Sequence, residues 1–170
     1  VSPACKKKDG GEKKTEKKQA VQKEEAKKAE KAKKEKEKAA AKEVTLEPVG
    51  NQMKYKQTEF SVKPGQKVKI VFNNTATSKA MKHNVIVINS SEEEGGNDVA
   101  KEVATKGMKA GKEADFVPDH DGILAHSAMA DPGSKVEFTF TAPEKPGTYP
   151  YLCSYPGHFP MMQGDMKVAK

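Results

Sequence analysis

Short runs in which apolar and polar residues alternate dominate the last three quarters of the chain and predict β-strands. Val68, Ile70 and Phe72 alternate with polar or smaller side chains, as expected of a strand with one face in a core. A Pro-Gly turn signal at 64–65 separates this run from the one before it. Residues 83–88 are almost continuously apolar, which predicts a strand buried on both faces. The other strand-like runs are residues 44–50, 52–56, 59–62, 134–143, 147–158 and 164–170.

The connection spanning residues 91–122 departs from this alternation. It is polar and rich in turn-forming residues, yet Val99, Val103 and Met108 recur at roughly helical spacing after Asp98, a candidate N-cap. One short helix is therefore predicted inside a long connection. Strands and helix together predict an all-β sandwich of seven or eight strands with one short inserted helix.

Residues 1–43 differ in composition, with 16 Lys, 9 Asp or Glu and no aromatic residue. Residues 12–43 are good helix formers, and many Glu–Lys pairs fall at the supporting i,i+4 spacing. Val21 is the only large apolar side chain within 12–43, so no hydrophobic stripe exists with which a helix could pack. We expect a solvated, partly helical tail that acts as a tether favouring anionic surfaces, or simply as a solubilising segment, ahead of a domain at 44–170.

The net charge of +7 belongs to this tail, since the remaining residues carry 15 Lys and 15 Asp or Glu. The basic composition therefore says little about the domain. The sequence contains no Arg, the residue preferred for bidentate contacts to phosphates and bases, and no glycine-rich phosphate loop. No nucleic-acid partner is expected. No apolar run reaches the roughly 18 residues of a transmembrane helix.

The two cysteines, Cys5 and Cys153, lie far apart in the chain, so a disulfide framework is not expected. The segment VSPAC, which ends at Cys5, resembles a bacterial lipoprotein processing site, at which the cysteine would carry lipid. Lipid on Cys5 would make the tail a membrane anchor. The alternative is an incidental free cysteine.

The chemistry-bearing residues gather near the end of the chain. Cys153, His158 and Met162 place a thiolate, an imidazole and a thioether at offsets 0, +5 and +9, in a loop rich in Pro and Gly between two predicted strands. His83, at the start of the apolar run 83–88, supplies a second imidazole. Two His and one Cys with a weak Met are the donor set of a type 1 (blue) copper site. The sequence therefore predicts a single copper ion on these four residues.

These residues also allow other interpretations. Met161 is the rival of Met162 for the thioether position, although neighbours on a strand point to opposite sides. A zinc site favours Cys and His without a thioether, and a Cys–His nucleophile needs an orienting group and an oxyanion hole that no motif here supplies. His120 and His126 are taken as ordinary surface or core residues.

Residues 81–84 (MKHN), 123–127 (ILAHS) and 153–168 (CSYPGHFPMMQGDMKV) resemble the azurin and auracyanin branch of the cupredoxin family. The resemblance covers residues 44–170 and implies a Greek-key β-sandwich with copper near one end. It also implies that Asn84 braces the two ligand loops through Ser154. Backbone N–H groups near Asn84 and Tyr155 would point at the Cys153 sulfur and tune the reduction potential.

Three positions depart from the azurin pattern. Lys82 stands where azurins have glycine, so a weak axial contact of its backbone carbonyl with copper is an open question. Val85 stands where azurins have Trp. The disulfide of azurins cannot form, because Cys153 is the only cysteine of residues 44–170.

The resemblance implies a protein that shuttles single electrons between redox partners and is not an enzyme, since a further catalytic metal site would have only His120 and His126. Expected partners are redox proteins such as cytochromes or copper and haem oxidoreductases, bound by a monomer. The expected location is the bacterial periplasm or cell envelope, with Cys5 as the membrane anchor. Electrons would pass at the exposed edge of His158, which an apolar patch surrounds: Met81, Phe159, Pro160 and Met161. The alternative function is a copper carrier or storage protein that uses the same ligands.

Overall fold

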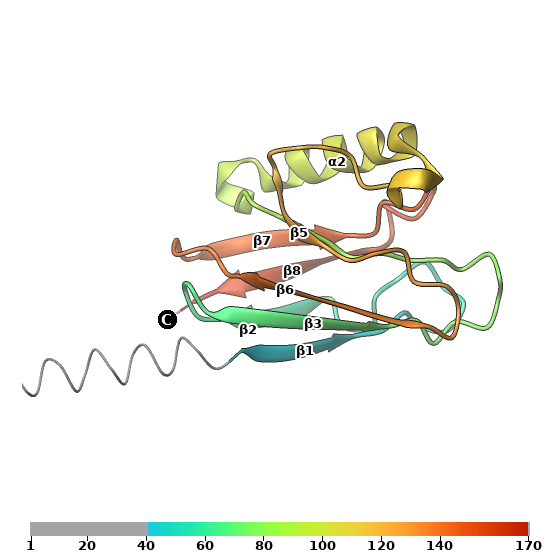
Figure 1. Ribbon diagram of the computed structural model, residues 1–170. Helices are drawn as coiled ribbons and strands as arrows, with labels where there is room; N and C mark the ends of the chain where they lie inside the picture. The colour runs from blue at the N-terminus through green and yellow to red at the C-terminus, as the bar shows by residue number, and fades with distance from the viewer. Residues whose placement is uncertain (1–40, 170) are drawn as a thin grey trace, which may run out of the picture. The chain divides into compact units, whose positions relative to one another are not determined.

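The computed structural model describes residues 41–169, which form two β-sheets packed face to face (Figure 1). One sheet has the strand order β1-β3-β6 and the other the order β2-β8-β7-β4-β5. The predicted tail, with Cys5, lies outside the described residues apart from its last three. The strands are β1 (Lys42–Leu46), β2 (Glu59–Val62), β3 (Lys67–Asn73), β4 (Ile86–Ile88), β5 (Ile123–His126), β6 (Lys135–Thr141), β7 (Gly147–Leu152) and β8 (Gln163–Val168).

The predicted sandwich of seven or eight strands is confirmed, with eight strands in the described part of the chain. The prediction of a strand at residues 52–56 is wrong, because these residues form turns. Only an isolated bridge joins Tyr55 to Pro48. Tyr55 is nevertheless buried in the main core, and its hydroxyl donates to the backbone oxygen of Asn84 at 2.7 Å. The sequence pattern does not predict strand β5.

The chain crosses between the two sheets at the turn 64–65, where Gly65 adopts a φ of 63°. The strands on either side of this turn, β2 and β3, therefore pair with other partners. β1 runs parallel to β3, and β2 runs parallel to β8, the last strand of the domain. As a result the edge strand β2 is fixed only when β8 is in place.

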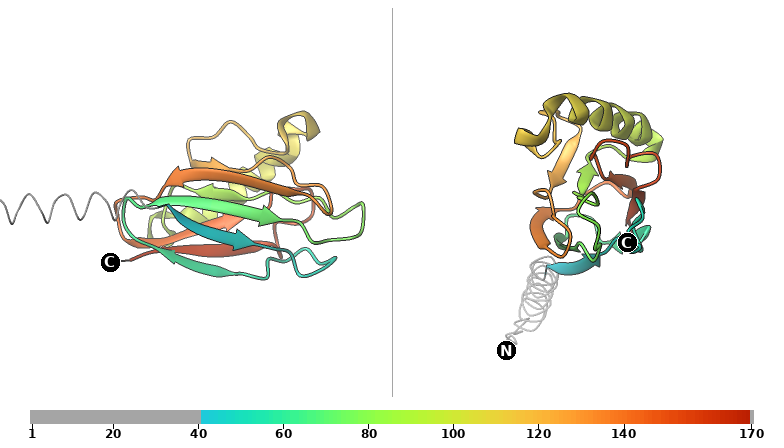
Figure 2. Two further views of the ribbon diagram at one scale, coloured as in Figure 1. Left: turned by 60° about the horizontal axis from the view of Figure 1, so that its bottom comes forward. Right: turned by 90° about the vertical axis from the view of Figure 1, so that its right-hand side faces the viewer.

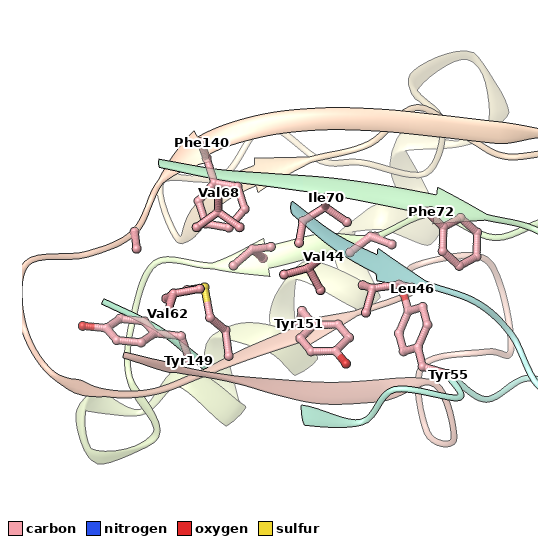
Figure 3. Packing of buried hydrophobic residues seen from close by; sticks show 14 of the residues in the cluster. Val44, Leu46, Tyr55, Val62, Val68, Ile70, Phe72, Phe140, Tyr149 and Tyr151 are labelled. Atoms are coloured by element: carbon pink, nitrogen blue, oxygen red, sulfur yellow. The ribbon is translucent and has the colours of Figure 1, made fainter. Parts of the chain in front are cut away.

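The main core lies between the two sheets (Figure 3). Val68, Ile70 and Phe72 of β3 are fully buried, as the alternation predicted. Tyr55 meets Phe72 edge to face at a centroid distance of 6.0 Å and packs against Tyr151 at 5.2 Å. Such aromatic contacts add to the free energy that burial of apolar surface supplies.

Helix α2 (Gly96–Ala110) covers the outer face of the five-stranded sheet, between the short 3-10 helices η1 (Glu92–Glu94) and η2 (Lys112–Ala114) (Figures 1 and 2). The predicted helix is present, but Asp98 is not its N-cap. Gly95, with a φ of 85°, takes that position, and Asp98 lies in the first turn. The helix face that packs consists of Gly96, Ala100, Val103, Ala104 and Gly107.

One of the three residues at helical spacing lies off the packing face of α2. Met108 is 52% exposed, because it follows Gly107 around the helix and points away from the sheet. No helix among residues 41–169 is both long enough and apolar enough to cross a bilayer.

The apolar run 83–88 is buried on both faces, as predicted. Val85 and Val87 point into the core between the sheets, whereas Ile86 and Ile88 point towards α2. The strand therefore has no solvated face, which explains why its sequence lacks alternation. His83 lies three residues before the first residue of β4, so the buried strand helps to fix its position.

Candidate metal centre

His83 and the Cys153–Met162 loop meet at one end of the sandwich, although 70 residues separate His83 from Cys153. His83 forms a bridge with Ala130: its N–H donates to the Ala130 oxygen at 3.2 Å and its oxygen accepts at 2.8 Å. Cys153 directly follows β7, and His158 lies in the turn that leads to β8. Two neighbouring strand ends of one sheet thus hold the residues.

The ligand loop is closed by its own backbone. The N–H of Cys153 donates to the oxygen of Met162 at 3.1 Å, and the oxygen of His158 accepts from Met161 and Met162 at 3.1 and 2.9 Å. Gly157 has a φ of 83°, a conformation that favours glycine. These contacts turn the three donors of the loop back on themselves, which an extended strand could not do.

The donor atoms form a compact triangle. Nδ1 of His83 lies 3.1 Å from Nδ1 of His158, and the Cys153 Sγ lies 4.0 and 3.8 Å from these two nitrogens. A circle through three points at these distances has a radius of about 2.1 Å, close to the roughly 2.0–2.3 Å of metal–nitrogen and metal–sulfur bonds. The three residues therefore fit one metal ion. They are the only such group among His, Cys, Asp and Glu of the described part of the chain.

Burial controls the protonation of these donors. It raises the pKa of the Cys153 thiol to about 11, against the opposing effect of two backbone N–H donors. Burial, with the neighbouring His158 second, lowers the pKa of His83 to about 4, and burial also lowers the pKa of His158. At neutral pH the metal-free site thus holds a thiol and two neutral imidazoles, and a bound cation would compensate the buried thiolate charge.

The two adjacent methionines have opposite surroundings. Met162 is fully buried and packs in the same core cluster as Cys153, whereas Met161 is 64% exposed. An exposed thioether cannot reach a buried site, so the structure favours Met162 over its rival. The side chain of Lys82 points to Asp131, with Nζ 2.5 Å from Oδ1, and the contact of its carbonyl with a metal stays a prediction.

Asn84 joins the two ligand segments, as the resemblance implied. Its Oδ1 accepts from the Ser154 N–H at 2.9 Å, and its Nδ2 donates to the Ser154 Oγ at 2.9 Å. The backbone N–H groups of Asn84 and Tyr155 donate to Cys153. The Tyr155 ring also packs on His158 at a centroid distance of 4.7 Å.

Asn74 is a supporting residue that the sequence did not reveal. It is fully buried, and its Nδ2 donates to the oxygens of Met81 and Ala130, each at 2.9 Å. Asn74 thereby joins the segment at Met81, which leads into His83, to the segment at Ala130, which forms the β-bridge with His83. The signal in the sequence was a polar residue at the end of an alternating strand, which also fits an ordinary turn.

The predicted apolar patch is only partly realised. His158 keeps 3% of its surface exposed, so its exposed edge is small. Pro160 and Met161 are exposed and Met81 is half-buried, while Phe159 packs against the cluster beneath α2.

The two remaining histidines lie elsewhere. His120 accepts from the Gly122 N–H through Nδ1 at 2.9 Å, and its Nε2 lies 3.6 Å from Glu102. His126 is exposed at the end of β5. Neither joins the metal-binding group, in agreement with the ordinary roles expected of them.

Comparisons with known proteins agree with this geometry. The family described as copper binding proteins, plastocyanin/azurin family, matches residues 42–169. Auracyanin-A of Chloroflexus aurantiacus is 40% identical over 120 residues, which cover 70% of this chain and 69% of the relative. Azurin of Achromobacter denitrificans is 32% identical over 137 residues, covering 77% and 87%.

Solved structures give the same result for the fold. A dithionite-reduced auracyanin from the photosynthetic bacterium Roseiflexus castenholzii superposes with a TM-score of 0.68 and 37% identity, over 77% of this chain and 99% of that one. Auracyanin A of Chloroflexus aurantiacus, described as a blue copper protein, gives 0.66 and 37%, over 76% and 100%. The chain therefore belongs to the plastocyanin/azurin family of copper binding proteins.

Proposed function

We propose that this protein is a type 1 copper electron carrier in which His83, Cys153 and His158 hold one copper ion and Met162 is its weak axial ligand. The observation that carries the proposal is the triangle of two imidazole nitrogens and one sulfur, sized for one ion and buried beneath the surface. When bound, copper supplies a one-electron couple between Cu(II) and Cu(I).

The surrounding residues hold the donors in one arrangement and keep water away. The bridge to Ala130 fixes His83, and the hydrogen bonds of Asn84 to Ser154 fix the start of the ligand loop. A site held in this way changes little when its charge changes, which favours rapid electron exchange. The N–H donors to Cys153 stabilise negative charge on sulfur and so set the potential.

The direct test is the visible spectrum and voltammetry of the copper-loaded protein. We expect strong visible absorption from thiolate-to-copper(II) charge transfer and a reversible one-electron wave. Cys153→Ser should abolish the absorption, because hydroxyl oxygen does not provide this transition. A colourless wild-type protein after copper loading would contradict the proposal.

Electron exchange with partners is placed at the edge of His158, the copper-ligating imidazole that keeps a little exposed surface. Met161, at 64% exposure, is an exposed apolar side chain of the adjoining patch. Brief redox encounters use small interfaces, and such a patch suits them. Cytochromes and copper or haem oxidoreductases are the proposed partner class, and a monomer is the proposed state.

A charged residue in the patch tests this docking surface. We expect Met161→Lys to slow electron exchange with a redox partner several-fold and to leave the potential nearly unchanged. Met108→Lys is the matched control, since Met108 is also exposed but lies on α2. If stopped-flow rates of electron exchange fall equally in both variants, or in neither, the patch is not the docking surface.

The rival function, a copper carrier or storage protein, needs ligands that an acceptor can reach. His83, Cys153 and Met162 have no exposed surface, which argues against ready metal exchange. Rapid transfer of copper to an acceptor chelator, at a rate faster than domain opening, would favour the carrier. We also propose that the protein has no enzymatic activity of its own.

We place the protein outside the bacterial cytoplasm, in the periplasm or cell envelope, because the proposed chemistry and the family suit that location. Lipid on Cys5 and a tether formed by residues 1–43 complete this proposal. Mass spectrometry of the native protein tests it: an unmodified Cys5, or a mature chain that starts beyond it, would exclude the lipid anchor.

A further inference from the structure

Asp115 and Phe116, which follow η2, have an uncommon backbone conformation. Their φ angles are 51° and 57°, and within residues 41–169 they are the two non-glycine residues with positive φ. This left-handed region brings Cβ close to the backbone, and a bulky residue such as Phe rarely occupies it. Backbone of this kind persists where the surroundings enforce it, and it concentrates at functional sites.

Local hydrogen bonds enforce this conformation. The N–H of Asp115 donates to the Lys112 oxygen at 3.1 Å, and the N–H of Phe116 donates to the Gly111 oxygen at 2.9 Å. The Phe116 ring meets the Tyr155 ring edge to face at 5.3 Å. The segment is thus tied to the end of α2 on one side and to the metal-ligand loop on the other.

Asn84 and Ser154 form a brace between the two ligand segments. The backbone oxygens of Asp115 and Phe116 accept hydrogen bonds from these two residues. Asn84 Nδ2 donates to the Asp115 oxygen at 3.0 Å, and Ser154 Oγ donates to the Phe116 oxygen at 2.6 Å. Asn84 and Ser154 are the residues that bond each other across the two segments. Two consecutive left-handed residues therefore supply one acceptor to each member of the brace.

Helix α2 packs closely against Phe116 and Ser154 at Gly107. A Cβ added at Gly107 would lie 2.3 Å from the Phe116 oxygen and 3.2 Å from the Ser154 Cβ. Because a real Cβ does not approach an oxygen so closely, the helix can sit here only with glycine at this position. The inserted helix and the dipeptide after it thus form one support against Ser154.

We propose that Gly107, Asp115 and Phe116 are positioning residues that set the reduction potential from outside the ligand loop, by fixing Asn84 and Ser154. Asn84 and Tyr155, the neighbour of Ser154, carry the two backbone N–H donors to Cys153, so a shift of the brace changes those bonds. The inference deepens the proposed electron-transfer function and rests on it.

The sign of the effect follows from charge. Reduction adds one electron to the site, and N–H donors to the sulfur stabilise the more negative state. Loosening the support weakens these donors and disfavours the reduced state. The potential should therefore fall when the left-handed dipeptide is disturbed.

Asp115→Val and Asp115→Gly form a matched pair, because both remove the carboxylate and only valine opposes a positive φ. Relative to Asp115→Gly, we expect Asp115→Val to lower the Cu(I)-to-Cu(II) affinity ratio about threefold, or about 28 mV for a one-electron couple. In the metal-free protein, amide hydrogen exchange at Ser154 and Tyr155 should be about fivefold faster in Asp115→Val. Equal values in the two variants, including an equal shift of both, would overturn the inference.

A second pair probes the helix. Gly107→Ala should shift potential and exchange in the same direction as Asp115→Val. Gly122→Ala is its control: a Cβ there would lie 2.3 Å from Val99 Cγ1, so it also strains the packing of α2, but away from Ser154. If Gly122→Ala matches Gly107→Ala in both measurements, the effect belongs to the helix in general and the positioning role is wrong.

The metal-free exchange measurement keeps this inference separate from the proposed function. If the wild-type protein shows no charge-transfer absorption with copper, the proposed function fails by itself. If the wild-type protein shows the absorption, but Asp115→Val and Asp115→Gly have the same amide exchange rates and the same potential, only the positioning role fails.

Discussion

At the scale of single residues, Met161 and Met162 show how strongly surroundings decide chemistry. The two side chains are identical and adjacent, yet one is 64% exposed and the other is fully buried beside Cys153. Both N–H groups donate to the His158 oxygen, so the two residues share one turn and their side chains leave it in different directions. The assignment of Met162 as the proposed axial ligand therefore depends on its position in the turn and not on the residue type.

Replacing each methionine by leucine separates their roles, because the swap removes the thioether and keeps the volume. Met162→Leu should raise the potential by tens of millivolts, about a three- to tenfold gain in relative Cu(I) affinity, since Cu(II) loses a weak donor. Met161→Leu should leave the potential unchanged. Voltammetry of both variants decides, and an effect of Met161→Leu alone would reverse the assignment.

Protonation at the site predicts a pH dependence of metal affinity. The pKa of Cys153 is about 11 and that of His83 about 4, so between about pH 6.5 and 9 the metal-free site loses one thiol proton on binding an ion. Affinity for Zn²⁺, a redox-inert probe, should therefore rise about tenfold per pH unit in this window. Calorimetry in buffers of different ionisation enthalpy measures the released proton. An affinity independent of pH would mean that Cys153 is already a thiolate.

At the scale of elements, α2 and β4 act together. The side chains of β4 that face away from the sandwich are covered by the packing face of α2, which includes Val103. The helix thus shields from solvent the outer face of β4, the strand that follows His83. Its packing buries the side chains of β4 that face away from the main core.

Val103→Ala removes two buried carbon atoms from this contact and should lower the free energy of unfolding by about 1.5–3 kcal/mol. Met108→Ala on the same helix should change it by less than about 0.5 kcal/mol, because Met108 is 52% exposed. Urea denaturation of both variants measures the difference. Similar losses in the two variants would show that Met108 packs against the protein.

The sequence predicted those elements in which chemistry or alternation was strong, and missed those that depend on distant partners. The alternation of Val68, Ile70 and Phe72 predicted β3. The spacing of Cys153, His158 and Met162 predicted the metal site. Strand β5 has only four residues, ILAH, without a regular alternation, and it is recognised as a strand only through its pairing with β4 at the edge of the sheet. The start of α2 was misplaced, because Gly95 caps it through a left-handed φ that no local pattern reveals.

At the scale of the whole molecule, charge is distributed unevenly along the chain. Residues 1–43 carry the whole net charge of +7, and the remainder is neutral. Electrostatic attraction to anionic surfaces should therefore belong to the tail and be screened by salt. The copper site should be independent of it.

A chain that begins at residue 41 tests this division. We expect it to keep the visible spectrum of the copper-loaded full chain and to lose retention on anionic vesicles at about 0.02 M salt. Co-sedimentation at about 0.5 M salt should abolish retention of the full chain as well. Equal retention of both chains at low salt would place the binding surface on the domain.

The parallel pairing of β2 with β8 has a consequence for how the protein is made. This pair joins residues from opposite ends of the domain, so folding has a high contact order and waits for β8. A chain synthesised only as far as residue 152 has neither β8 nor the thiol and imidazole that follow β7. The thiol and imidazole of the proposed metal site thus leave the ribosome together with the last strand, and we expect metal binding to follow completion of the sandwich rather than to precede it.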